Sequence, residues 1–180
     1  MMKATGIVRK IDNLGRVVIP KEIRSEMKID NGNTLEIFVD KDETVILKKY
    51  SPVREISDIN DYIETLVDTT DCSIMITDTD RIVASSSDLE EYSKQQIGKE
   101  VKKAMEKRKS LNLTEAIDQD ICTDFRAENE ELGSLIINPI LKQGDVLGTI
   151  ILSSREKELG DFEEKISNIT ARVISKKLGL

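Results

Sequence analysis

The sequence contains no histidine and no tryptophan, and only 3% of its 180 residues are aromatic. Without histidine, the chain lacks the usual general base of enzymes and the commonest nitrogen ligand of metals. Few aromatic rings argue against a platform on which single-stranded bases stack. We find no glycine-rich phosphate loop, nucleophile elbow or distinctive carboxylate pair. We therefore predict no catalytic residue, no metal ligand and no enzyme activity.

Cysteine and long apolar runs are also scarce. Cys72 and Cys122 lack the C-x-x-C spacing of metal or redox motifs, and no basic residue adjoins either one to activate a thiol. We expect both to be buried as small apolar side chains in a reducing compartment. The start of the chain has no apolar signal segment, and no window approaches the ~20 apolar residues of a membrane span. The sequence predicts a soluble, cytoplasmic protein without membrane contact.

Charge is distributed unevenly along the chain. The net charge is −7, yet residues 1–50 hold ten basic and eight acidic residues, whereas the remainder holds 17 basic and 26 acidic residues. The first region is therefore +2 and the second −9. A basic segment joined to an acidic one indicates that the first region has an anionic partner.

The first 50 residues alternate short β-rich runs with turn residues. Residues 12–15 form a turn whose glycine tolerates positive φ. Pro20 suits the first turn of a helix because its missing N–H would be unsatisfied there anyway, and residues 30–32 suit the end of that helix. The expected order is strand, strand, helix, strand, strand (ββαββ), at residues 5–11, 16–19, 21–27, 35–39 and 44–47.

Four short strands and one short helix cannot bury enough apolar surface to be stable alone. We therefore expect this region to fold as a homodimer.

A boundary follows at residues 51–55, where Pro52 disfavours continued helix or strand. Beyond it we expect helices around an antiparallel sheet, with an acidic loop at residues 118–131. The expected helix in the middle of this region covers residues 88–109. The expected strands cover residues 73–77, 81–85, 111–117, 134–140 and 146–152.

Two stretches of the second region carry apolar residues at alternating spacings of three and four, which predicts two helices with one apolar stripe each. Paired across a two-fold axis, such helices give a four-helix bundle. The alternative is that each stripe packs on the sheet of its own chain. We favour the bundle, because two strict stripes exceed what sheet packing requires. The stripe residues are Ile56, Ile59, Ile63 and Leu66, and then Leu159, Phe162, Ile166, Ile169 and Val173.

Four cations of the first region are placed to meet DNA. Arg9 and Lys10 end one expected strand, Arg16 begins the next, and Arg24 projects from the helix. A two-fold dimer doubles this set along one face, where cations meet phosphates and arginine forks meet guanine edges. From composition alone, solvation of a small β domain explains these charges equally well.

Residues 5–24, with the string D-N-L-G-R-V-V-I-P at 12–20, together with residues 35–39 and 46–50, resemble the DNA-binding domain of the AbrB transition-state regulators. The resemblance implies that two chains exchange hairpins into one β-barrel, and that arginines at positions 9, 16 and 24 contact double-stranded DNA, with Lys10 on a further basic position. Ser25 departs from the family, which often has a second arginine there.

The layout of the whole chain is similar to the stage V sporulation protein T family, in which a GAF-like domain follows an AbrB-like one. The implied fold class is α+β. The implied domains are a half-barrel at 1–50, a linker at 51–55 and a GAF-like domain flanked by helices at 56–180. The implied function is a nucleoid-associated forespore regulator that activates and represses late sporulation genes as a homotetramer.

GAF-like domains often bind small molecules in a cup between sheet and helices. Candidate lining segments are residues 73–77, the loop after Ser85 and residues 135–140. The cyclic-nucleotide motif is absent, so we predict no known cofactor. An unidentified small ligand and a cup used only for assembly both stay open.

The basic stretch from Lys99 to Lys109 has two interpretations. It is either a second DNA contact or, as we favour, a self-paired solvated helix face. The function of the whole chain also has a competing interpretation, as an antitoxin-type protein or a nucleoid-architectural protein without ligand sensing.

Overall fold

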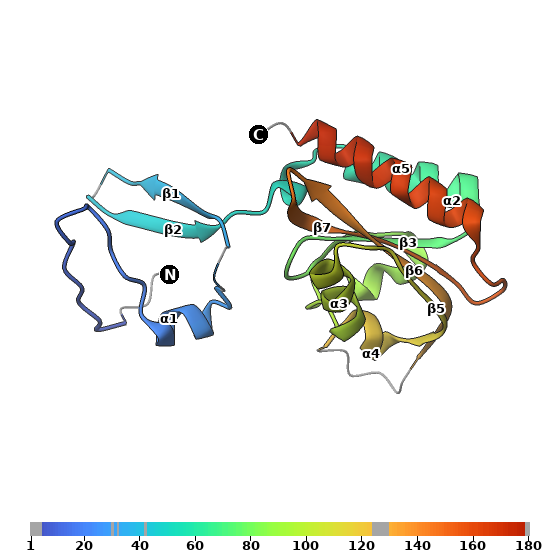
Figure 1. Cartoon of the computed structure of the whole chain (residues 1–180), viewed down its shortest axis with the longest axis horizontal. Coiled ribbons are helices and arrows are strands. Elements are labelled where there is room, and N and C mark those ends of the chain that lie inside the picture. Colours follow the sequence, from blue (N-terminus) through green and yellow to red (C-terminus); the bar gives the residue numbers. More distant parts are fainter. Residues whose placement is uncertain (1–4, 30, 32, 42, 124–129, 179–180) are drawn as a thin grey trace. The chain divides into compact units, whose positions relative to one another are not determined.

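The structure is a computed structural model that describes residues 5–29, 31, 33–41, 43–123 and 130–178. The chain divides between Tyr50 and Ser51 into two compact units, here called the head and the body (Figure 1). No helix in the described ranges is long and apolar enough to cross a membrane. Each unit has its own secondary structure and is treated by itself.

The head consists of one helix and one hairpin. Helix α1 spans Lys21–Glu26 and begins directly after Pro20, as expected for a residue without an N–H to satisfy. Strands β1 (Leu35–Val39) and β2 (Val45–Lys49) pair antiparallel. Glu36 lies opposite Lys48 in this ladder, so one cross-strand pair has opposite charges.

The two strands that we expected at residues 5–11 and 16–19 are not formed within one chain. The turn between them is closed by two backbone hydrogen bonds, from Asp12 N–H to Arg16 O and from Gly15 N–H to Asp12 O, both at 3.0 Å. A ladder needs a neighbouring strand, and β1 and β2 pair with each other rather than with this segment. The expected helix end at residues 30–32 rests on positions 30 and 32, which lie outside the described residues.

The body contains a five-stranded antiparallel sheet of order β4-β3-β7-β6-β5. The strands β3 and β5 have the bounds that the sequence predicts, and the other three differ from prediction by one to three residues at their ends. The five strands are β3 (Ser73–Thr77), β4 (Ile82–Ser85), β5 (Leu111–Ile117), β6 (Glu131–Lys142) and β7 (Asp145–Ser154).

Helices cover both faces of this sheet (Figure 1). Alternation along the strands divides the core, since neighbouring side chains point to opposite faces. Ile74 and Ile76 pack with α2 (Ile59–Thr70) and α5 (Asp161–Lys177), whereas Met75 packs in the cluster that includes α3 (Lys99–Lys107) and α4 (Asp118–Ile121). The body therefore buries two apolar clusters within a single chain.

The expected helix at residues 88–109 is wrong in its first half. A short 3₁₀ segment, η2 (Ser87–Tyr92), is followed by residues without helix, and α3 begins only after Gly98. Ile97 is buried and bridges Cys122, while a Cβ at Gly98 would lie 2.6 Å from Asp120 O. This close approach of two backbone segments overrides the local helical pattern.

Two expected irregular segments are ordered parts of the body. Residues 51–55, expected as a linker, include the 3₁₀ helix η1 (Pro52–Glu55), in which Pro52 and Val53 are buried. Arg54 forms an ion pair with Asp78 at 2.6 Å. Part of the expected acidic loop at 118–131 is also ordered, because α4 occupies its start and β6 begins at its last residue. Positions 124–129 of that loop lie outside the described residues.

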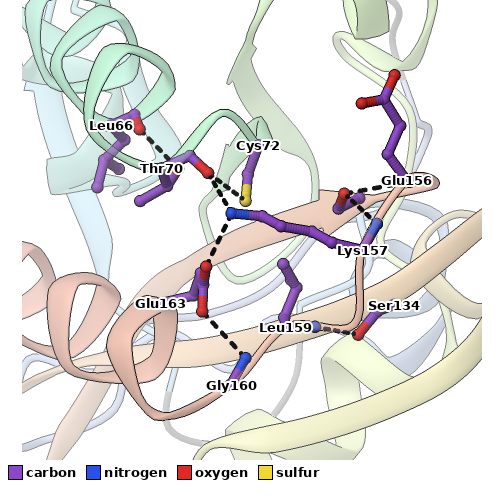
Figure 2. Close-up of polar contacts among 10 residues, drawn as sticks. Leu66, Thr70, Cys72, Ser134, Glu156, Lys157, Leu159, Gly160 and Glu163 are labelled. Atoms are coloured by element: carbon purple, nitrogen blue, oxygen red, sulfur yellow. Dashed lines mark hydrogen bonds and ion pairs between the residues drawn. The ribbon is translucent and has the colours of Figure 1, made fainter.

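One lysine ties the end of α2 to the start of α5 (Figure 2). Lys157 Nζ donates to Thr70 O at 2.7 Å and to Glu163 Oε1 at 2.9 Å, while Gly160 N–H donates to Glu163 Oε2 at 3.0 Å. The Lys157 hydrogen bond lowers the pKa of Glu163. Cys72 Sγ shares Thr70 O, and burial raises the pKa of its thiol. We call Lys157, Thr70, Glu163 and Gly160 the helix clamp.

Candidate DNA-binding interface

Arg16 is held by the turn that precedes it. Asp12 Oδ1 accepts hydrogen bonds from the N–H groups of Leu14 and Arg16, both at 2.9 Å, and Asp12 Oδ2 accepts from Arg16 Nε at 2.7 Å. Gly15 has φ +75°, which a larger residue rarely adopts. The Arg16 hydrogen bonds lower the pKa of Asp12, so the carboxylate is ionised when it orients the guanidinium. The side chain of Arg16 remains 70% exposed.

The other three predicted cations differ in how firmly they are held. Arg9 and Lys10 are exposed, and Arg9 Nη1 donates only to the adjacent Val8 O at 3.2 Å. Arg24 is half-buried on α1 and donates to Asn31 Oδ1 at 3.2 Å, while its Nε is buried without a partner. Arg16 is therefore the most rigidly placed cation of the turn, and Arg24 keeps an unused donor.

Sequence reasoning missed the part that Asp12 plays. An aspartate followed by glycine at i+3 and arginine at i+4 is typical of a side-chain-capped turn, and this spacing was available in the sequence. Asp12 orients Arg16 and would not itself contact an anionic partner.

The head leaves an unusual amount of apolar surface uncovered in one chain. Val8 is 84% exposed, Leu14 74% and Val18 72% on the expected hairpin, and Val39 is 77% exposed on β1. Large exposed apolar patches mark interaction surfaces. The cations Arg9 and Arg16 thus lie on a segment whose apolar side chains are available to another chain.

The predicted oligomerisation residues separate into two groups. Ile56, Ile63, Leu66 and Leu159 are buried in the body core, with Ile59 and Ile166 packed against it. The first stripe therefore packs in the core of its own chain, as in the alternative that we weighed against the bundle. Only Phe162, Ile169 and Val173 remain exposed, by 53%, 58% and 46%. We call these three residues the α5 stripe.

Part of the predicted lining of the ligand cup lies in the apolar core. Met75, Leu135 and Ile137, from the expected lining segments, are fully buried together with Tyr92 and Ile97. Both cysteines are buried, and the described residues contain no group of three His, Cys, Asp or Glu side chains suited to a metal. These five apolar side chains thus belong to a packed core cluster.

Comparison with known proteins gives matches over both units. A family model described as stage V sporulation protein T C-terminal, transcription factor, matches residues 55–179. A model described as antidote-toxin recognition MazE, bacterial antitoxin, matches residues 8–55. Stage V sporulation protein T of Bacillus subtilis (strain 168) is 38% identical over 179 residues, covering 98% of this chain and 99% of that protein.

The chain belongs to the stage V sporulation protein T family of transcription factors. This confirms the resemblance found in the sequence and the prediction that the protein is not an enzyme. The transition state regulatory protein AbrB of Bacillus subtilis (strain 168) is 63% identical over 51 residues, which cover 28% of this chain and 52% of AbrB. The head is an AbrB-like DNA-binding domain.

The body has the GAF fold. The GAF domain of an Acinetobacter phosphoenolpyruvate-protein phosphotransferase aligns with a TM-score of 0.55 at 14% identity, covering 73% of this chain and 84% of that one. A GAF domain/HD domain protein from Geobacter sulfurreducens gives 0.53 at 17% identity, covering 70% and 93%. The predicted α+β class, with an AbrB-like domain before a GAF-like one, is confirmed.

Proposed function

We propose that this family member is a sequence-preferring regulator of late, forespore-stage sporulation genes, acting as activator and repressor. Two heads pair and present Arg9, Lys10, Arg16 and Arg24 to double-stranded DNA. The observation that carries the proposal is the turn in which ionised Asp12 fixes an exposed Arg16. A guanidinium held in place by its turn loses little side-chain entropy on binding and can engage a phosphate or a guanine edge with its fork.

Substitution of the turn arginine tests this proposal. We expect Arg16→Ala to weaken binding to a specific promoter by about 1–3 kcal/mol, more than it weakens binding to random DNA at the same salt. Arg16→Lys retains the charge but not the fork, so it should restore affinity for random DNA and not the preference. The measurement is a mobility shift with both DNAs over a series of salt concentrations.

Lys41→Ala provides the matched control, because it removes one exposed charge from the turn between β1 and β2 and is not one of the four proposed contacts. It should leave promoter preference unchanged. Equal promoter affinity of Arg16→Ala and the unsubstituted protein would contradict the assignment.

We further propose that the protein is a homotetramer, with the heads pairing through their exposed apolar side chains and the bodies pairing through the α5 stripe. Each head has exposed apolar side chains on the expected hairpin segment, and each body has one exposed apolar stripe on α5. Two separate pairing surfaces on one chain allow two dimers to join into a closed assembly.

The antitoxin alternative predicts a poorly ordered segment after the head, which would order only on a toxin. The body instead buries two apolar clusters in one chain. The architectural alternative differs only in DNA preference, and the comparison of promoter with random DNA decides it.

A further inference from the structure

A groove of about 340 Å³ lies in the body between α5 and the turn that joins α3 to β5. Its walls include Arg108 and Lys109 from the turn and Asn168 and Arg172 from α5, with Asn138 from β6 between them. The volume lies within the range of small-molecule sites. The groove is separate from the packed apolar cup on the other face of the sheet.

The groove exists because β6 continues beyond its neighbour. The ladder between β5 and β6 ends at Leu111 opposite Ile137, whereas β6 runs on to Lys142. The first residues past the ladder are Asn138 and Pro139. Proline fits an unpaired strand edge because it has no N–H to contribute to a ladder. This free edge leaves room beside the helix for a ligand.

Three cations and no acidic residue line the groove. Arg108, Lys109 and Arg172 make no ion pair with a described residue, whereas Lys99 and Lys103 on α3 pair with Asp120 and Glu100. This pairing agrees with a self-paired face over the first part of the basic stretch. At the end of the stretch the cations are unpaired, in a unit whose sequence is otherwise strongly acidic.

Backbone groups, not side chains, cap the end of α3. The N–H groups of Arg108 and Lys109 donate to Met105 O at 3.1 Å and Ala104 O at 3.4 Å. Arg108 has φ +52°, the left-handed conformation that a glycine usually adopts at a helix end. An arginine at this position keeps a charged side chain at the groove, at the cost of a less favourable backbone.

Amide groups complete the site. Asn138 is 4% exposed, and its Nδ2 donates to Ser167 Oγ at 3.2 Å, which fixes the amide against α5. Asn168, half-buried on α5, also lines the groove. Fixed amides beside unpaired cations provide donors and acceptors of the kind that orient a polar ligand.

Two of the three residues of the α5 stripe lie on a different flank of α5 from the groove. At 100° per residue, Asn168 and Arg172 point to one side of the line that faces the sheet, and Phe162 and Val173 point to the other. Ile169 lies between these flanks and lines a second pocket with Asn168 and Arg172.

We propose that this groove binds a small phosphorylated molecule, with Arg108, Lys109 and Arg172 on its phosphates and the two asparagine amides on its remaining polar groups. Guanidinium groups bind phosphate through two parallel hydrogen bonds, which suits an anion held between arginines from two elements. The site shares no residue with the proposed DNA contacts of the head.

Calorimetric titration of the full chain with inorganic pyrophosphate tests the site. The unsubstituted protein binds, and the double variant Arg108→Gly with Arg172→Ala loses about tenfold in affinity for each guanidinium removed. Arg108→Gly supplies the residue usual at its backbone conformation, so the melting temperature of the single variant is retained or raised while its affinity falls. A purely structural role of Arg108 predicts the opposite change in melting temperature.

The matched control is Lys102→Ala with Lys176→Ala, which removes the same charge from exposed positions of α3 and α5 outside the groove. It retains pyrophosphate affinity. Three outcomes overturn the proposal: no pyrophosphate binding by the unsubstituted protein, equal losses in the two double variants, or a groove variant that loses affinity for DNA while pyrophosphate binding is unchanged.

Discussion

The head and the body differ in how much apolar surface one chain covers by itself. Prolines aside, the described part of the chain has 32 buried apolar residues, and only Ile29 of these lies in the head. Twelve of the sixteen large apolar side chains that are exposed belong to the head, although it is the shorter unit. The body has a complete core within one chain. The head has many apolar side chains, but one chain does not cover them.

This difference means that the two units are stabilised in different ways. If the heads pair as proposed, the head is stable only in the dimer, and pairing brings its proposed DNA-contacting cations into register. A unit with its own core stays folded whether or not the heads pair. On this proposal the stability of the head depends on protein concentration, whereas that of the body depends on its internal packing.

The largest expected effect is from a charge on the uncovered surface of the head. Val18→Asp places a carboxylate at a position that we expect to be buried in both chains of the head dimer. The free energy of forming the dimer should become less favourable by more than about 3 kcal/mol. We expect DNA affinity to fall more than about 100-fold. Scanning calorimetry should show the loss of a concentration-dependent transition while that of the body is retained.

Thr69→Asp is the control for added charge, since Thr69 is exposed on α2. It should leave both transitions in place. If Val18→Asp lowers the transition of the body as well, the two units are not independent and the contrast between them is wrong.

The next largest effect is expected from a substitution that destabilises the body and not the head. A Cβ at Gly148 would lie 1.9 Å from Thr77 O, where β7 passes β3. Gly148→Ala should therefore lower the free energy of unfolding of the body by about 3 kcal/mol. Denaturant unfolding should show this loss while the concentration-dependent transition of the head persists.

Gly144→Ala is its matched control. Gly144 has φ +95° but nothing within 4 Å of an added Cβ, so only the backbone strain of about 1 kcal/mol should appear. Equal effects of the two substitutions would show that the contact between Gly148 and Thr77 does not determine packing.

The sequence predicts the sheet of the body well because its strands are apolar runs separated by polar turns. Residues 73–77 and 111–117 have their expected bounds. The helix expected at 88–109 fails because the packing of Gly98 on the backbone of residues 120–122 is a tertiary contact, which a helical pattern of polar residues does not contain.

Apolar spacing alone also does not identify which flank of a helix faces the sheet. In α2 the spaced residues Ile63 and Leu66 point inward, as a stripe should. In α5 the sheet instead receives Ser167 and Ala171, where Asn138 of β6 bonds to Ser167 and the helix packs closely. The buried residues of α5 thus include two small ones beside Glu163 and Ile174, and part of the apolar stripe is left exposed.

The candidate sites show the same division. The four head cations are close in the sequence and match a known domain, so they were predicted by position. The groove is lined by Arg108 and Arg172, which lie far apart in the sequence. They line one groove because β6 extends beyond the end of its ladder with β5. No sequence spacing contains that information.

A smaller effect is expected at the α5 stripe, which is exposed on the body. Ile169→Asp places a charge within the α5 stripe without touching the core, so the body should keep its unfolding free energy. We expect association of the bodies to weaken about tenfold or more, which reduces the proposed tetramer to dimers paired through their heads. Light scattering over a concentration series measures this change.

Asn60→Asp, on the exposed surface of α2, adds the same charge outside the stripe and should leave the mass unchanged. A tetramer that persists in Ile169→Asp would show that the bodies pair through another surface.

The smallest effect concerns the helix clamp, which only the body contains. The pKa of Glu163 is lowered by its hydrogen bond from Lys157, so the ionised carboxylate stabilises the folded state. That contribution is complete above the usual glutamate pKa of about 4.3 and is lost as pH falls through the lowered value.

Glu163→Gln keeps an acceptor for Gly160 N–H but not the charge. It should lower the free energy of unfolding at neutral pH by only about 1 kcal/mol, because Lys157 is partly exposed to solvent. In denaturant unfolding from pH 7 to 3, the difference between the two proteins should therefore shrink. A difference that does not change with pH would mean that the clamp acts by shape and not by charge.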